Sequence, residues 1–207
     1  MSHPRLVIIV RHGQSEHHVR GLTGGWTDTP LTDTGHEQAH RVATRLKGEL
    51  GDRAITLYTS DLLRAGETAR HIADAFGVEP VADERIREHN NGEAANLTWD
   101  EAKARFPEAF AQPPHSLWSG EPQLVPGAET GAQFYERCAS FLDSLPADGP
   151  IPLLVTHGGT IMCLVARWLL IEPQGIAPIG FSAHTTGITV LTGRPYRQLE
   201  RLNDASH

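Results

Sequence analysis

The chain has 207 residues and a mass of 22.6 kDa, which suits one compact domain better than two. Its 39% hydrophobic and 21% charged residues are typical of a globular protein and exclude a disordered, collagen-like or coiled-coil chain. The formal net charge of −7, with no long run of Lys and Arg, argues against a nucleic-acid partner.

The start of the chain and its cysteines bear on location. Only five apolar residues, Leu6 to Val10, follow the first charged residues, and this run is too short for a signal-peptide core or a membrane span. The two cysteines, Cys138 and Cys163, fit a reducing compartment better than a disulfide framework. We therefore expect a cytoplasmic protein with no membrane partner.

Short apolar, β-branched runs alternate along the chain with segments whose apolar residues recur at helical spacing. In chain order the predicted elements are a strand at 6–10, a helix at 32–50, a strand at 55–59, a helix from a cap at Ser60 or Asp61 to Phe76, a helical piece at 99–106, a helix at 131–145, a strand at 153–156, a helix at 160–170 and a last strand at 188–191. This alternation predicts an α/β fold, a three-layer α/β/α sandwich with a mostly parallel central sheet. We expect a single domain over 1–207, with an irregular, substrate-covering excursion at about 79–126.

Polar side chains follow three of the predicted strands at the point where each strand ends. Arg11 and His12 follow the first strand, Arg64 lies shortly after the second, and His157 with two glycines follows the third. Ligands of such sheets bind beyond the carboxyl ends of the strands, so these four side chains are expected to converge. Guanidinium forks match phosphate oxygens, and helix N-termini add backbone N–H groups. The sequence therefore predicts a phosphate pocket.

A histidine in such a pocket is a candidate nucleophile. A ring nitrogen of His12 can attack phosphorus while the flanking cations stabilise the charge on the equatorial oxygens. This step needs no metal ion, so we expect no cofactor. The departing alkoxide needs a proton, and Glu88 is the best-placed carboxylate outside the predicted regular elements.

Five motifs, in order along the chain, resemble those of the histidine phosphatase superfamily, which is also called phosphoglycerate-mutase-like. They are Arg11-His12-Gly13, the loop from Gly25-Trp26 to Gly35, Ser60 to Ala69 with Arg64, Glu88 with Gly92, and His157-Gly158-Gly159. One Arg-His-Gly tripeptide alone is a weak signal, but the ordered set covers most of the chain. The resemblance implies a phosphoglycerate-mutase-like fold.

The resemblance also implies roles for individual residues. His12 would form a phosphohistidine, and Arg11 and Arg64 would clamp the phosphate. His157 would be a second partner of the transferred group, and Glu88 the proton donor and acceptor. Further substrate contacts are expected from Ser15, from His18 at a position where the family often has Asn, and from Thr23, Gly24 and Gly158.

Departures from the family's pattern favour phosphatase activity over mutase activity. The predicted acid is followed by His89-Asn90-Asn91, where mutases typically have Arg-Tyr-type residues, and no adjacent Arg pair occurs in the chain. Such residues grip a bisphosphorylated ligand, so their absence favours water as the final acceptor. We therefore expect a metal-independent phosphatase that acts on a small phosphorylated metabolite.

Two alternatives share the same pocket. A 2,3-bisphosphoglycerate-dependent phosphoglycerate mutase stays open because the Gly25-Trp26 loop lies at a mutase-like distance from Arg11. A phospho-ligand-binding module without turnover is a non-enzyme alternative, which the presence of His12 and Glu88 opposes. The sequence determines neither the natural substrate nor the oligomeric state, and a homodimer is compatible with it.

A third alternative is a zinc peptidase. His36-Glu37-Gln38-Ala39-His40 matches the zinc-binding helix motif, in which two imidazoles lie one turn apart. A zinc site also needs a third ligand. The capping box that we expect from Thr34 and Glu37 explains the carboxylate without a metal, so no metal site is predicted.

Overall fold

The computed structural model of the chain describes residues 3–112, 117–118, 123–180, 182–193 and 195–207. Within them a six-stranded sheet has the order β3-β2-β4-β1-β5-β6. The strands are β1 Leu6–Arg11, β2 Ile55–Thr59, β3 Val81–Ala82, β4 Ile151–Thr156, β5 Ile188–Thr192 and β6 Gln198–Asp204. All pairs among β1 to β4 are parallel, while β5 pairs antiparallel with β1 and β6 antiparallel with β5. The mostly parallel sheet that the sequence predicted is confirmed.

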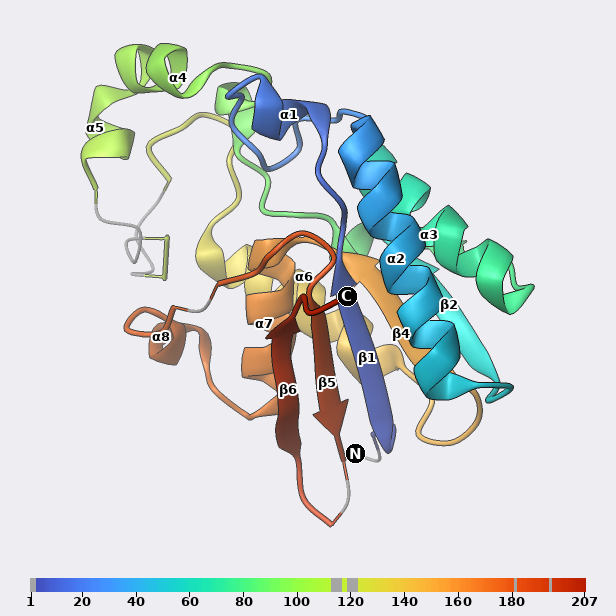
Figure 1. Ribbon diagram of the computed structural model, residues 1–207. Helices are drawn as coiled ribbons and strands as arrows, with labels where there is room; N and C mark the ends of the chain where they lie inside the picture. The colour runs from blue at the N-terminus through green and yellow to red at the C-terminus, as the bar shows by residue number, and fades with distance from the viewer. Residues whose placement is uncertain (1–2, 113–116, 119–122, 181, 194) are drawn as a thin grey trace.

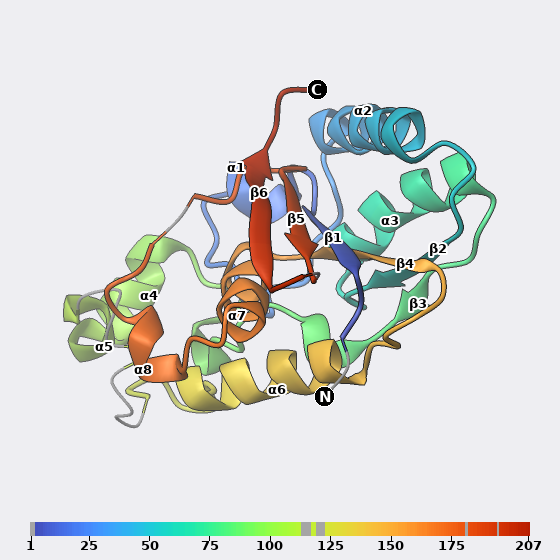
Figure 2. The same cartoon turned by 90° about the horizontal axis from the view of Figure 1, so that it is seen from below.

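Helices cover both faces of this sheet. They are α1 Glu16–Val19, α2 Asp33–Leu50, α3 Leu63–Phe76, α4 Trp99–Arg105, α5 Pro107–Ala111, α6 Gly131–Ser144, α7 Gly158–Trp168 and α8 Pro173–Ile176, with 3₁₀ turns η1 Glu84–Ile86 and η2 Gly92–Ala94. Figure 2 shows α2 and α3 on one face of the sheet and α6 and α7 on the other. The predicted three-layer α/β/α architecture is therefore confirmed.

The central strand β1 is apolar without alternation because both of its faces are covered. Val7 and Ile9 belong to the cluster that contains the buried residues of α6 and α7. Ile8 and Val10 belong to the opposite cluster, with the buried residues of α2 and α3. The burial of both faces holds the strand rigidly, so its carboxyl end is a fixed platform for the residues that follow it.

Three local predictions were wrong. Leu62 directly precedes α3 and forms no side-chain capping hydrogen bond, where a cap at Ser60 or Asp61 was expected.

The other two corrections concern the last strand and the start of α2. The chain forms another strand, β6, after the one at 188–191. This strand was not predicted, because none of its residues is fully buried and its sequence has no apolar run. At the start of α2, the capping residue is Thr32, whose side chain accepts a hydrogen bond from the Gly35 N–H at 3.1 Å. Thr34 and Glu37 thus lie inside the helix and form no capping box, because the helix begins earlier than the motif suggested.

Among its described residues, the segment at 79–126 contains β3, the 3₁₀ turns η1 and η2, α4 and α5, and residues 117–118 are also in 3₁₀ conformation. The helices α1 and α4 lie at the end of the sheet where β1 and β4 finish (Figure 1). Residues 113–116 and 119–122 of the predicted excursion lie outside the described residues. Among the described residues, no helix is both long and apolar enough to cross a membrane.

Substitution of glycine by alanine is expected to have opposite effects on the free energy of unfolding at two positions of α2. At Gly35 a methyl group would overlap the carbonyl oxygen of Gln14, whereas at Gly48 it would meet open space. Gly35→Ala is therefore expected to lower the free energy of unfolding by about 1–3 kcal/mol. Gly48→Ala is expected to raise it by up to about 1 kcal/mol, because alanine is the better helix former. Urea unfolding of both variants measures this, and equal effects would contradict the close approach at Gly35.

Candidate active site

His12 lies directly after β1 and is buried, with 2% of its surface exposed. Its Nδ1 atom lies 2.7 Å from the carbonyl oxygen of Gly13. A carbonyl oxygen only accepts hydrogen bonds, so Nδ1 carries the proton and Nε2 carries the lone pair. Nε2 accepts a hydrogen bond at 3.2 Å from Nε of Arg64. This tautomer gives the ring an unprotonated nitrogen that is able to act as a nucleophile.

Arg64 lies in the first turn of α3 and is buried, with 1% exposed. Its two terminal nitrogens donate to the carbonyl oxygens of Thr27 at 2.7 Å and Gly25 at 2.8 Å. Burial lowers the pKa of Arg64 to about 10, which leaves it charged at neutral pH. The loop after β1 also fixes the helix start, because Asp28 accepts from the backbone N–H of Leu63 at 2.8 Å.

His157 lies between β4 and α7 and is fully buried. Its Nε2 atom is 2.8 Å from the hydroxyl oxygen of Ser60, and its ring centroid is 5.1 Å from that of His12. Nδ1 of His157 and Nε of Arg11 are buried and have no hydrogen-bond partner among the described residues. Two buried polar nitrogens beside a candidate nucleophile fit a ligand rich in acceptor oxygens.

Arg11, which precedes His12 at the end of β1, is the second arginine of this cluster. Its terminal nitrogens contact the carbonyl oxygen of Ala183 and, at 3.2 Å, Nε2 of His18. Gly158 begins α7 beside it, and a side chain there would lie within 3.8 Å of the free Nε atom of Arg11. The first backbone N–H groups of α7 are thus close to a guanidinium group, an arrangement that suits an anion. We call the set Arg11, His12, Arg64 and His157 the phosphate pocket.

Two further imidazoles extend the pocket. His18 stacks on His12, with ring centroids 5.6 Å apart, and on His17, at 4.0 Å. Ser15 orients both of them, since its hydroxyl oxygen is 2.8 Å from Nδ1 of His17 and its N–H donates to Nδ1 of His18 at 3.1 Å. Ser15 therefore contacts two imidazoles, and its predicted contact with the substrate stays a prediction. Sequence reasoning missed His17, although the adjacent pair of histidines after Arg11-His12-Gly13 was a usable signal.

The four imidazoles of this cluster have lowered pKa values. Burial, followed by the charges of Arg64 and other neighbours, lowers the pKa of His12 and of His157 well below the ordinary value. Burial and neighbouring imidazole and guanidinium groups lower the pKa of His17 to about 3 and that of His18 to about 4. At neutral pH these rings are uncharged, so the positive charge of the pocket comes from its two arginines.

Glu88 follows η1, and backbone N–H groups hold its carboxylate. One oxygen accepts from the N–H of His89 at 2.8 Å, and the other accepts from the N–H of Gly159 at 3.0 Å. A methyl group at Gly159 would overlap the carboxylate. The second glycine after His157 is therefore required by the close approach of Glu88 to the first turn of α7.

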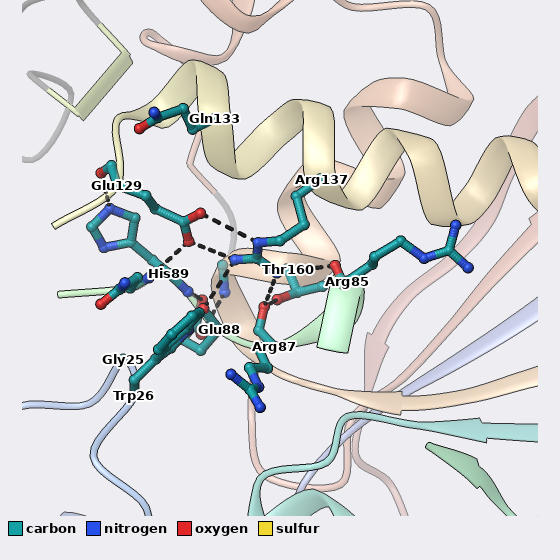
Figure 3. A network of polar contacts seen from close by, with 12 residues as sticks. Gly25, Trp26, Arg85, Arg87, Glu88, His89, Glu129, Gln133, Arg137 and Thr160 are labelled. Carbon is teal, nitrogen blue, oxygen red and sulfur yellow. Dashed lines mark hydrogen bonds and ion pairs between the residues drawn. The ribbon is translucent and has the colours of Figure 1, made fainter. Parts of the chain in front are cut away.

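Side chains from three other parts of the chain hold the backbone that carries Glu88 (Figure 3). Arg137 of α6 donates to three carbonyl oxygens within 85–88, at 3.0, 3.0 and 3.2 Å, and forms an ion pair with Glu129. The Trp26 indole donates to the carbonyl oxygen of residue 88 at 2.8 Å, and the Thr160 hydroxyl to that of residue 87 at 2.7 Å. Sequence reasoning missed these supports, because nothing in a local motif indicates which distant carbonyls an arginine will reach.

The remaining predicted contact residues lie beside Glu88. Thr23 is buried and its hydroxyl donates to the carbonyl oxygen of Ala94 at 2.5 Å. Thr23, Gly24 and Glu88 line a cavity of about 400 Å³ that extends to Trp99 and to α5. We call this the α4–α5 cavity. It opens beside the candidate acid and has a volume in the range of small-molecule sites.

The zinc-peptidase alternative finds no support in the site. His36 and His40 lie on α2 with their side chains exposed. Across the described part of the chain, no three His, Cys, Asp or Glu side chains are arranged so as to hold a metal ion. The structure instead brings together Arg11, His12, Arg64, His157 and Glu88, whose individual roles stay predictions.

Comparison with known proteins identifies the family. The model of the histidine phosphatase superfamily (branch 1) matches residues 7–205. A probable phosphoglycerate mutase of Yersinia enterocolitica is 37% identical over 172 residues, which cover 81% of this chain and 76% of that protein. The chain therefore belongs to the histidine phosphatase superfamily, as the motifs indicated.

Two solved structures share the whole fold. The phosphoserine phosphatase of Entamoeba histolytica, in complex with 3-phosphoglyceric acid, is 27% identical, with a TM-score of 0.77 and 98% of each chain covered. YhfR of Bacillus stearothermophilus is 25% identical, with a TM-score of 0.85 and 98% of each chain covered. The superfamily and these relatives indicate phosphatase or mutase activity.

The buried histidines predict that acid destabilises the chain. Unfolded histidine takes up a proton near pH 6.5, whereas folded His17 and His18 do so near 3 and 4. Between these values the unfolded state binds more protons, so the free energy of unfolding falls as the pH drops through this window. We expect a lower urea midpoint at about pH 5 than at about pH 7.5.

Substitution identifies the groups responsible for this pH dependence. His18→Asn is expected to reduce the difference between the two midpoints, because it removes one of the depressed imidazoles. The exposed His40, replaced in the same way, serves as the matched control and is expected to leave the difference intact. If wild type and His18→Asn lose the same stability on acidification, the pocket histidines are not its cause.

Proposed function

We propose that this member of the histidine phosphatase superfamily is a metal-independent phosphatase, which hydrolyses a small phosphate monoester through a phosphohistidine at Nε2 of His12. The observation that carries the proposal is the state of that nitrogen. Nδ1 is protonated against the Gly13 carbonyl oxygen, and Nε2 is unprotonated and faces a buried guanidinium group. A neutral imidazole beside fixed positive charge combines a nucleophile with the groups that stabilise a transferring phosphoryl group.

The reaction then has two steps. Nε2 of His12 attacks phosphorus, the N–P bond forms, and the bond between phosphorus and the ester oxygen breaks. Arg11, Arg64 and His157 stabilise the charge on the equatorial oxygens, and Glu88 gives its proton to the departing oxygen. In the second step the Glu88 carboxylate removes a proton from water, the water oxygen attacks phosphorus, and the N–P bond breaks to release inorganic phosphate.

Support for Glu88 as the acid comes from its position and surroundings. It lies close enough to Arg11 and Arg64 to interact with their charges. Its carboxylate is held by two backbone N–H groups and also lines the α4–α5 cavity. A group between the phosphate pocket and a cavity for the alcohol is suitably located to protonate the oxygen that joins them.

A phosphoglycerate mutase is the second candidate, because the curated relative at 37% identity is a probable phosphoglycerate mutase. A mutase must retain its phosphoglycerate for rephosphorylation, and a carboxylate or second phosphate is normally held by cations. Among the described residues that line the α4–α5 cavity there is no Lys or Arg. An assay primed with 2,3-bisphosphoglycerate separates the two, since isomerisation faster than hydrolysis would favour the mutase.

Nucleophilic catalysis by His12 predicts hydrolysis of p-nitrophenyl phosphate that survives EDTA. His12→Ala is expected to lose at least about 10³-fold in kcat, while the exposed His40→Ala keeps wild-type activity. A labelled phosphoenzyme that is labile to acid and stable to base is expected from wild type and absent from His12→Ala. Loss of turnover with EDTA, or near-normal activity of His12→Ala, would overturn the proposal. Tight phosphate binding with neither turnover nor phosphoenzyme would favour the non-enzyme alternative.

Protonation of the departing oxygen predicts that the effect of Glu88 depends on the alcohol. Glu88→Gln is expected to reduce kcat/KM for an alkyl phosphate by about 10²-fold or more. The loss for p-nitrophenyl phosphate is expected to be smaller, because that anion leaves without a proton. Glu108→Gln, an exposed change in α5, is the control. Equal losses for both esters would assign the proton to another group.

A further inference from the structure

The α4–α5 cavity contains aromatic faces that nothing in the phosphoryl-transfer reaction uses. Trp99 at the start of α4 and Phe110 of α5 meet edge to face, with ring centroids 6.1 Å apart at 87°. Both line the cavity, together with Ala94, Ala109, Val125 and Ala128. Half of the Trp99 surface is exposed. When an apolar group covers an exposed indole on the wall of a cavity, the removal of apolar surface from water favours binding.

Three polar side chains of the same wall, those of Thr23, His89 and Asn91, are already paired within the protein. Asn91 accepts from the backbone N–H of Trp26 at 3.0 Å and donates to the Thr23 hydroxyl at 3.2 Å. That hydroxyl donates in turn to a backbone carbonyl oxygen. Nε2 of His89 lies 2.7 Å from the carbonyl oxygen of Glu129. These three side chains hold the wall together, and Gln123 is the one other uncharged polar side chain among the described lining residues.

The described residues that line the cavity also provide no positive charge. The described lining residues include one carboxylate, that of Glu88, and no Lys or Arg. The sequence has no Lys or Arg between Arg105 and Arg137, and Arg105 forms an ion pair with Glu93. A second anionic group on a substrate would therefore lose its hydration without meeting a cation among the described lining residues.

We infer that the α4–α5 cavity binds the alcohol part of the substrate, and that this alcohol is aromatic or otherwise apolar and carries no acidic group. The substrate class is then a phosphate monoester of an uncharged apolar alcohol, with Trp99 and Phe110 as the specificity-determining residues. This inference rests on the proposed function: the phosphate lies in the phosphate pocket, the alcohol contacts Trp99, and Glu88 lies at the ester oxygen between them.

Three esters with the same primary alkoxide leaving group test the inference: n-propyl, 3-phenylpropyl and 3-carboxypropyl phosphate. The bond that breaks has the same chemistry in each, so differences in kcat/KM report contacts of the alcohol. We expect the 3-phenylpropyl ester to exceed the n-propyl ester by about ten-fold or more. The 3-carboxypropyl ester is expected to fall below both. No preference for the phenyl group, or preference for the carboxylate, would overturn the inference.

Substitutions identify the residues that make this selection. Trp99→Ala is expected to reduce the 3-phenylpropyl to n-propyl ratio of kcat/KM by about ten-fold, and Phe110→Ala is expected to reduce it in the same direction. Lys103→Ala, an exposed change on the same helix, is the matched control and is expected to keep the ratio. A ratio that stays at the wild-type value in both aromatic variants would contradict the assignment.

Binding of phosphonates separates this inference from the proposed function, because their C–P bond is not hydrolysed. Calorimetry is expected to show 3-phenylpropylphosphonate binding about ten-fold or more tightly than n-propylphosphonate. Tighter binding without turnover of any ester would support the cavity and overturn the phosphatase. Turnover of the n-propyl ester with equal phosphonate affinities would support the phosphatase and overturn the apolar cavity.

Discussion

The burial of the Arg64 guanidinium group is the constraint on which the active site depends. A buried guanidinium needs acceptors for its N–H groups, and it finds them in two carbonyl oxygens of the 25–27 loop and in Nε2 of His12. The loop must therefore fold over the start of α3, and His12 must keep that nitrogen unprotonated. Burial, and after it the same charge, lowers the pKa of His12 and of His157. One buried cation thus organises the loop and adds to the effect of burial on the imidazoles, and a phosphate is the kind of ligand that would offset its charge.

Glu88, the proposed acid, is positioned by a different part of the fold. Glu88 lies on a segment with little regular structure, yet its backbone receives hydrogen bonds from Arg137, Trp26 and Thr160, which belong to α6, to the loop after β1 and to α7. The carboxylate reaches the first turn of α7 only because residue 159 has no side chain. An irregular segment is in this way held in place through carbonyl groups that accept hydrogen bonds from other elements.

In the proposed function, recognition of the phosphate and of the alcohol is divided between separate elements. The phosphate pocket is built on residues that follow β1, β2 and β4, whose positions the sheet fixes. The α4–α5 cavity is built largely on the segment at 79–126, which contributes Trp99 and Phe110. On this proposal, changes in that segment would alter which alcohol fits without altering the groups around phosphorus. This division is consistent with one superfamily that includes both phosphatases and mutases.

The sequence by itself determined the elements that are buried on both sides, because a doubly covered strand such as Leu6–Arg11 must be continuously apolar. It also indicated Arg11, His12, Arg64 and His157. Each of them lies in a short sequence motif that follows a predicted strand, and their side chains are of the types that bind phosphate. It did not indicate the edge strand β6 or the cap of α2. It also missed the supports of Glu88 and the paired polar wall of the α4–α5 cavity. Those depend on contacts between residues far apart in the chain, and only packing in three dimensions decides which distant carbonyl, ring or carboxylate a side chain meets.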